Sequence, residues 1–273
     1  MKAACASLAP LALRHSGMAR ISQRRLFFGV LALVFATCAG LTIVWCLSMS
    51  TMPELPMPGG WTLSMTWAPM CGQKWPRIAV SFVGMWIVMM VAMLLPSLAP
   101  ALWRYHEALD RRGEASACRS TALMGMGYFV VWAVLGAVVF AVSFTFVTLA
   151  MQRPALSRSV PVAAGVVVLM AGASQFSAWK ARYLAFSRAI VLHGARSAYT
   201  HGMRHGMHCV GCCAGLTAVL LVNGVMDLRT MALVTLAISA ERLASAPERM
   251  ARAIGIVVVV LGLSMLARAF VFL

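Results

Sequence analysis

The sequence has few charged side chains, and very few of them are acidic. Charged residues make up 11% of the 273 residues, and Asp and Glu together number 7. Water-soluble domains carry about 25% charged residues, so this composition excludes an ordinary soluble globular protein. Disordered chains are poor in apolar residues, whereas 62% of this chain is hydrophobic. The composition therefore predicts a protein that crosses a membrane several times.

The sequence also lacks the signatures of common enzyme classes. It contains no P-loop, no G-x-G-x-x-G, no H-E-x-x-H and no Ser/His/Asp arrangement. These absences do not exclude catalysis, but they favour a non-catalytic role.

Apolar stretches long enough to cross a bilayer recur along the chain. A spanning helix needs about 20 mostly apolar residues. The candidate stretches are 26–49, 78–102, 122–150, 160–179, 209–228, 231–244 and 253–273. The sixth is short and ends on charged residues. We predict an all-α, polytopic transmembrane helix bundle of about seven spans, or six if residues 231–244 do not cross. Residues 26–273 would form a single domain that follows a basic tail, residues 1–25.

Positive charges are distributed unevenly around these spans. With the N-terminus in the cytoplasm, the cytoplasmic segments of a seven-span protein hold 17 Lys and Arg and the opposite segments hold 6. Short cytoplasmic loops collect Lys and Arg, so the pattern predicts a cytoplasmic N-terminus. The net charge of +16 would suggest nucleic acid in a soluble protein, but here the basic residues lie between apolar runs. We therefore expect a lipid bilayer as partner and no nucleic acid.

Cysteine and histidine are concentrated in one short stretch. Cys209, Cys212 and Cys213 are spaced i, i+3, i+4, which places them on one face of a helix. His205 and His208 precede Cys209 and Cys212 by one helical turn each. Thiolate and imidazole are suited to Cu(I) or Zn(II), and we favour copper. The cysteines are also explained as small buried residues that pack helices closely, so both interpretations stand.

A second group of residues could extend a metal site or line a route for an ion. His201 continues the histidine series by one more turn, and Met85, Met89 and Met93 form an i, i+4, i+8 row in the second predicted span. Glu241 is a carboxylate at membrane depth, where ionisable groups are costly and often functional. Methionine also fills gaps in helix bundles, and Glu241 also fits a salt bridge.

Two separated motifs resemble those of a known bacterial family. They read Trp86-x2-Met89-Met90-x-Ala92-Met93-x2-Pro96 and Gly206-x2-Cys209-x-Gly211-Cys212-Cys213. They resemble the family of predicted metal-binding integral membrane proteins over about residues 65–262. The resemblance implies a polytopic protein of the bacterial inner membrane, and the activity of that family is largely undefined.

One stretch departs from the family pattern. Family members tend to carry Lys-x2-Cys-Leu-x2-Cys-Arg before the Gly-Cys-Cys motif, but here Tyr183 and Ser187 stand where the two cysteines would be. If those cysteines bind metal in relatives, this chain lacks part of their site. Its additional histidines would then compensate, or this member no longer binds metal.

Three functions fit these features. We favour metal handling, in which the Cys/His stretch binds or moves a soft ion and exchanges it with a donor or acceptor protein. The alternative is a non-catalytic membrane scaffold or assembly partner, in which the Gly/Cys/Ala face packs against a neighbouring helix. The third is a membrane thiol oxidoreductase that uses Cys209 and Cys212 as a redox pair.

Overall fold

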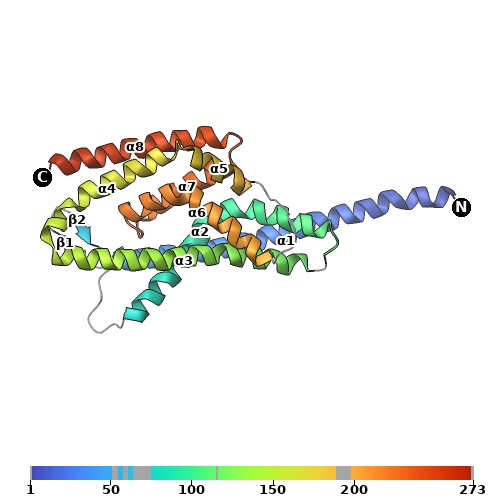
Figure 1. Cartoon of the computed structure of the whole chain (residues 1–273). Coiled ribbons are helices and arrows are strands. Elements are labelled where there is room, and N and C mark those ends of the chain that lie inside the picture. Colours follow the sequence, from blue (N-terminus) through green and yellow to red (C-terminus); the bar gives the residue numbers. More distant parts are fainter. Residues whose placement is uncertain are drawn as a thin grey trace.

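The computed structural model describes residues 2–50, 55–57, 61–63, 75–114, 116–188 and 198–271, which form a helical bundle (Figure 1). Its helices are α1 (Lys2–Ser50), α2 (Trp75–Asp110), α3 (Ala117–Gln152), α4 (Pro154–Ser174), α5 (Ala178–Arg188), α6 (Ala198–Asn223), α7 (Leu228–Leu243) and α8 (Pro247–Val271). A small antiparallel hairpin is made by β1 (Leu55–Met57) and β2 (Trp61–Leu63). The predicted all-α fold class is confirmed.

Six of the described helices are long and apolar enough to cross a membrane, namely α1, α2, α3, α4, α6 and α8. Helix α7 has 16 residues, fewer than the roughly 20 that a span requires. The six-span alternative therefore fits the described helices. Apolar side chains such as Leu33, Val142 and Val257 are exposed on α1, α3 and α8, which is compatible with contact to lipid.

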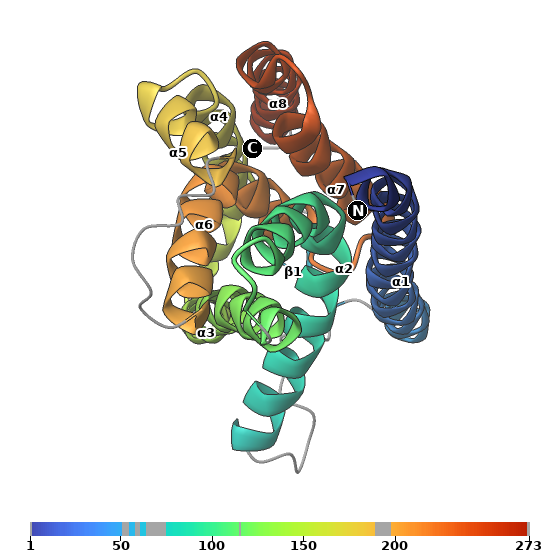
Figure 2. The same ribbon diagram turned by 90° about the vertical axis from the view of Figure 1, so that its right-hand side faces the viewer.

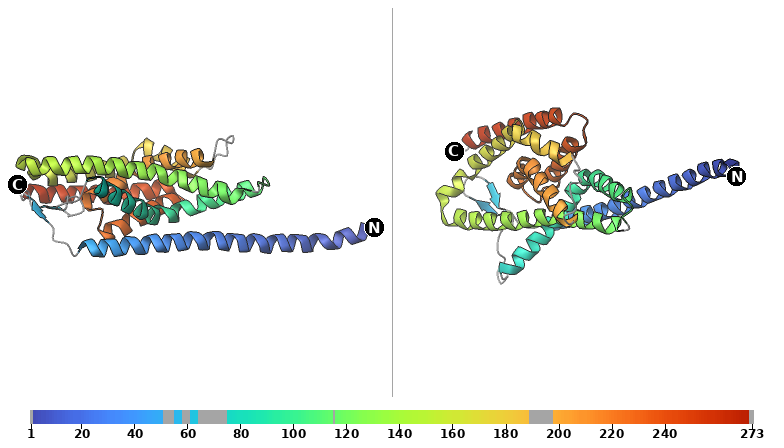
Figure 3. Two further views of the ribbon diagram at one scale, coloured as in Figure 1. Left: turned by 90° about the horizontal axis from the view of Figure 1, so that it is seen from below. Right: turned by 45° about the vertical axis from the view of Figure 1, so that its right-hand side comes forward.

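The long helices pack in pairs (Figure 2). Helix α3 packs against α2 and α6, and α4 packs against α8. Helix α1 runs along one side of the bundle, where it contacts α2, and extends beyond the other helices at its N-terminal end (Figure 3). The largest buried side chains lie on α2 and α3. Among them, the Trp86 indole N–H donates to the carbonyl oxygen of Trp132 over 3.0 Å.

Helix α6 begins well before the fifth span expected from hydropathy, which started at residue 209. It begins at Ala198 because glycines let its polar first half pack backbone to backbone against α3. A Cβ atom added to Gly202 would meet the carbonyl oxygen of Met124, and one added to Gly127 would meet that of Tyr199. Such close approach is typical of membrane helix pairs. The three cysteines consequently lie in the middle of α6 rather than at its start.

A tight turn separates α6 from α7. Gly224 has a φ of 110°, a conformation that glycine adopts without strain. The Asp227 carboxylate then caps α7, because it accepts hydrogen bonds from the backbone N–H groups of Arg229 at 3.1 Å and Thr230 at 3.2 Å. The turn directs α7 back into the bundle, toward the cysteines of α6.

Removing this cap should weaken the start of α7. The Thr230 hydroxyl and the capped N–H groups hold the pKa of Asp227 below its usual value. A lowered folded-state pKa means that the stabilisation is present at neutral pH and is lost as the pH falls through that lowered pKa. Asp227→Ala should cost about 1 kcal/mol at pH 7, measured by unfolding in detergent. Asp227→Asn should retain most of the stability. If Asp227→Ala were as much less stable than the wild type in acid as it is at pH 7, the Asp227 carboxylate would not be the cap.

Candidate metal centre

Cys209 and Cys213 point to the same side of α6. They are one helical turn apart, both are fully buried, and their Sγ atoms lie 3.8 Å apart. A metal–thiolate bond is about 2.3 Å long, so two sulfurs that share one ion at angles of about 110–120° lie roughly 3.8–4.0 Å apart. The separation of this pair matches that requirement. Cys213 also contacts its neighbour Cys212.

Polar groups from three other helices surround Cys209. The Tyr128 hydroxyl on α3 donates to its Sγ over 2.8 Å, and Nη1 of Arg242 on α7 lies 3.2 Å from the same sulfur. The same Nη1 atom also donates to the Tyr128 hydroxyl at 3.3 Å and to Oγ of Ser97 on α2 at 3.2 Å. The Cys209 thiol on α6 is thus held by the Tyr128 hydroxyl from α3 and the Arg242 guanidinium from α7.

The positive charge of Arg242 is buried without a carboxylate beside it. Its exposed fraction is 6%, and among the described residues it makes no ion pair with Asp or Glu. A buried and uncompensated charge is strongly destabilising. A thiolate at Cys209, 3.2 Å from Nη1 of Arg242, would supply a compensating negative charge, and the thiolate is also the form of cysteine that binds metals.

A buried ion pair lies beside Cys212 of α6. Nζ of Lys180 lies 2.7 Å from Oε2 of Glu241 and donates to the backbone carbonyl of Cys212 over 2.7 Å. Glu241 has no exposed surface and Lys180 is 6% exposed. Glu241 therefore forms the salt bridge that the sequence allowed, but with Lys180 and inside the bundle. Sequence reasoning assigned Lys180 to a loop, because nothing local shows that α5 folds back against α6.

The three histidines of α6 lie in different environments. Nε2 of His205 is 3.4 Å from Nη2 of Arg242, so this ring belongs to the surroundings of Cys209. The His208 ring stacks on Phe186 of α5 at 4.8 Å, and His201 stacks on a tyrosine of α2 at 5.5 Å. Within the described part of the chain, no three Cys, His, Asp or Glu side chains converge as a metal-binding group.

The predicted methionine row leads toward the cysteines. Met85, Met89 and Met93 are all buried on α2, with exposed fractions of 9%, 2% and 3%. Ser97, one turn after Met93, contacts Arg242. The row therefore ends one helical turn from the polar groups that hold Cys209.

Tyr183 stands at the first of the two positions where the family pattern that the sequence resembles has a cysteine. Its ring packs against Gly211, where an added Cβ would meet the ring edge at 2.7 Å. It fills the contact between α5 and α6 with aromatic carbon instead of sulfur. The side chain of Ser187, at the second such position, lies outside the described residues.

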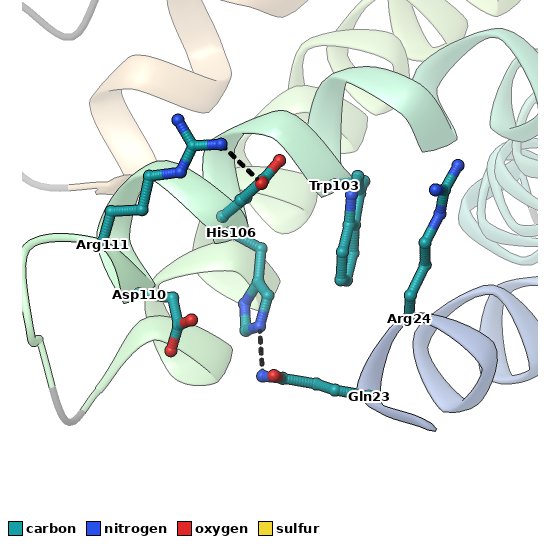
Figure 4. A pocket seen from close by; sticks show the side chains of 7 residues that line it. Gln23, Arg24, Trp103, His106, Asp110 and Arg111 are labelled. Carbon is teal, nitrogen blue, oxygen red and sulfur yellow. Dashed lines mark hydrogen bonds and ion pairs between the residues drawn. The ribbon is translucent and has the colours of Figure 1, made fainter. Parts of the chain in front are cut away.

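A surface pocket lies apart from the cysteines, between α1 and α2 (Figure 4). Its volume is about 230 Å³, and its lining includes Gln23 and Trp103. His106 projects into it and makes a 3.0 Å hydrogen bond with the side-chain amide of Gln23. No predicted ligand lines this pocket, so the candidate centre is buried and distinct from it.

Comparison with known proteins identifies a family. Residues 83–265, more than half of the chain, match the model of the family described as PpoB2, copper chaperone. The match includes the methionine row, the cysteines of α6 and Arg242. No curated protein and no solved structure matches the chain.

Proposed function

We propose that this chain, which belongs to the PpoB2 copper chaperone family, binds Cu(I) at Cys209 and Cys213 and exchanges it with a partner protein. The observation that carries the proposal is the 3.8 Å separation of two fully buried sulfur atoms. Soft thiolate ligands suit Cu(I). The family description supports copper as the bound ion.

Charge balance favours Cu(I) over Zn(II). Two thiolates and one Cu(I) carry a net charge of −1, which the adjacent Arg242 guanidinium neutralises. Two thiolates and Zn(II) are neutral together, and Arg242 would then remain an uncompensated buried charge. Structural zinc sites also use four protein ligands. A low-coordinate Cu(I) site therefore suits the pair better.

The other predicted cysteine, histidine and glutamate ligands fall into three groups. Cys212 contacts Cys213, and His205 contacts Arg242 beside Cys209. Both side chains are therefore candidates to accept the ion during exchange. His208 and His201 would first have to leave the aromatic rings on which they stack. Glu241 balances Lys180, and we assign it a structural role.

We place the protein in the bacterial inner membrane with a cytoplasmic N-terminus. The six apolar helices support insertion. With six spans and the N-terminus in the cytoplasm, the cytoplasmic segments hold 15 Lys and Arg and the opposite segments hold 8, which supports the orientation. The basic residues 1–25 would precede one transmembrane domain. Met85, Met89 and Met93 would line the path by which copper reaches the cysteines.

Copper binding by purified protein tests the proposal. The reduced protein in detergent is titrated anaerobically with Cu(I) in the presence of bicinchoninate as a competing chelator. Cys209→Ser/Cys213→Ser should bind one Cu(I) fewer per chain than the wild type, because serine removes both soft ligands but keeps similar volume and polarity.

The matched control is Cys38→Ser/Cys118→Ser, which removes two cysteines outside the centre. It should bind as much copper as the wild type. Circular dichroism and gel filtration establish that each variant is folded. Equal copper binding by Cys209→Ser/Cys213→Ser and the wild type would overturn the proposal.

A further inference from the structure

A second group of sulfur atoms lies apart from Cys209 and Cys213. Sγ of Cys46, near the end of α1, lies 3.8 Å from Sδ of Met226 and 4.0 Å from Sδ of Met231. Met226 belongs to the turn after α6, and Met231 lies in α7. Cys46 is 4% exposed and Met231 is 5% exposed, while Met226 is partly buried against the core. We call these three residues the Cys46 cluster.

We propose that the Cys46 cluster is a second Cu(I) site. One thiolate and two thioethers are soft ligands of the kind that select Cu(I). With metal–sulfur bonds of about 2.3 Å and trigonal geometry, ligand sulfurs lie about 4.0 Å apart. Both measured separations from Cys46 agree with that value. The Cys46 thiol therefore lies at a metal-compatible distance from each of the two thioethers.

The charge of such a site suits its surroundings. Cu(I) bound by one thiolate and two neutral thioethers carries no net charge, so burial among apolar side chains costs little. The Asp227 carboxylate, next in sequence to Met226, is exposed. A negative charge at the margin of the cluster attracts a cation toward it.

Gap filling by methionine is the plain alternative for these contacts. Gap filling explains one methionine packed beside Cys46. It does not require that the Sδ atoms of both Met226 and Met231 lie about 4 Å from the Cys46 sulfur, the spacing of sulfurs bound to one ion. The cluster joins a helix near the start of the chain with a turn and a helix about 180 residues later. Convergence of three soft atoms from three elements favours a binding site.

The position of the cluster suggests its use, an idea that rests on the proposed function. Along α7, Met231 and Arg242 lie about 16 Å apart at 1.5 Å per residue, and Arg242 contacts Cys209. Helix α2 packs against both α1 and α7, and its buried methionine row covers about 12 Å at the same rise. The Cys46 cluster is thus an uptake or release site at one end of a sulfur-lined path to the buried pair.

The test counts Cu(I) bound per chain in full-length protein, with bicinchoninate as competitor. Met226→Leu/Met231→Leu removes the thioethers at nearly constant volume, so the fold should survive. Met126→Leu/Met170→Leu, at two exposed methionines, is the matched control. We expect two Cu(I) for the wild type and the control, and one for the Met226/Met231 variant.

Combination with Cys209→Ser/Cys213→Ser separates this inference from the proposed function. Cys209→Ser/Cys213→Ser alone should retain one Cu(I), whose X-ray absorption shows only sulfur neighbours, and the combined variant should bind none. A wild type that binds a single Cu(I), lost only with Cys209 and Cys213, would overturn the second site and leave the proposed function standing. A wild type that binds a single Cu(I), lost only with Met226 and Met231, would overturn the proposed function and leave the second site standing.

Discussion

Lys180→Met should destabilise the protein by about 3–5 kcal/mol, the expected cost of leaving one member of a buried ion pair alone. Glu241 has no exposed surface, and the Lys180 ammonium lies 2.7 Å from its carboxylate. The same ammonium group donates to the Cys212 carbonyl, so its loss also leaves that acceptor without its donor. Thermal or denaturant unfolding of the purified protein in detergent measures the effect.

Two further variants identify the cause. Lys180→Met/Glu241→Met replaces the pair with apolar side chains and should recover most of the lost stability, because an apolar replacement of a buried pair is often neutral. Arg182→Met removes an exposed positive charge from the same helix and should change stability little. If Lys180→Met were as stable as Arg182→Met, the ion pair would not hold α5 and α7 against α6.

Gly127→Ala should separate α3 from α6. The added Cβ atom meets the backbone carbonyl of Tyr199, and a backbone atom cannot move aside by changing rotamer. Overpacking of this kind costs about 1–3 kcal/mol or more. Because Tyr128 follows directly and donates to Cys209, the variant should also weaken Cu(I) binding in the bicinchoninate competition.

Gly125→Ala is a matched control on the same helix. Apart from its chain neighbours and its own helix backbone, no atom of the described residues lies within 4 Å of the Cβ that it adds, and alanine favours a helix by up to about 1 kcal/mol over glycine. It should therefore leave stability unchanged or raise it, with copper binding intact. Equal effects of the two substitutions would show that helix propensity, not the contact between α3 and α6, determines the result.

The helix boundaries show where sequence reasoning reached its limit. Hydropathy placed the start of the fifth span near Cys209, because the preceding residues are polar and glycine-rich. In the structure Gly202 and Gly206 give α6 a face that fits the backbone of α3, and the helix begins at Ala198. Glycine weakens an isolated helix, so Gly202 and Gly206 favour α6 only because they let α3 pack closely against it.

The candidate ligands show the same limit. Helical spacing correctly placed Cys209 and Cys213 on one face, because a four-residue interval is a local property. The same spacing made His205 and His208 equivalent. The structure separates them, because α7 brings Arg242 to one ring and α5 brings Phe186 to the other.

The sequence by itself determined that the protein is an all-α bundle with helices long and apolar enough to cross a membrane, and that Cys209, Cys212 and Cys213 share one helix. Both follow from residue composition and short-range periodicity. Only the tertiary structure decided that Lys180 neutralises Glu241, that Arg242 faces Cys209, and that Cys46 meets two methionines. These buried charges and sulfur atoms contact residues that lie 33 to 185 positions away in the sequence. Such contacts depend on how the helices pack, which short-range sequence patterns do not predict.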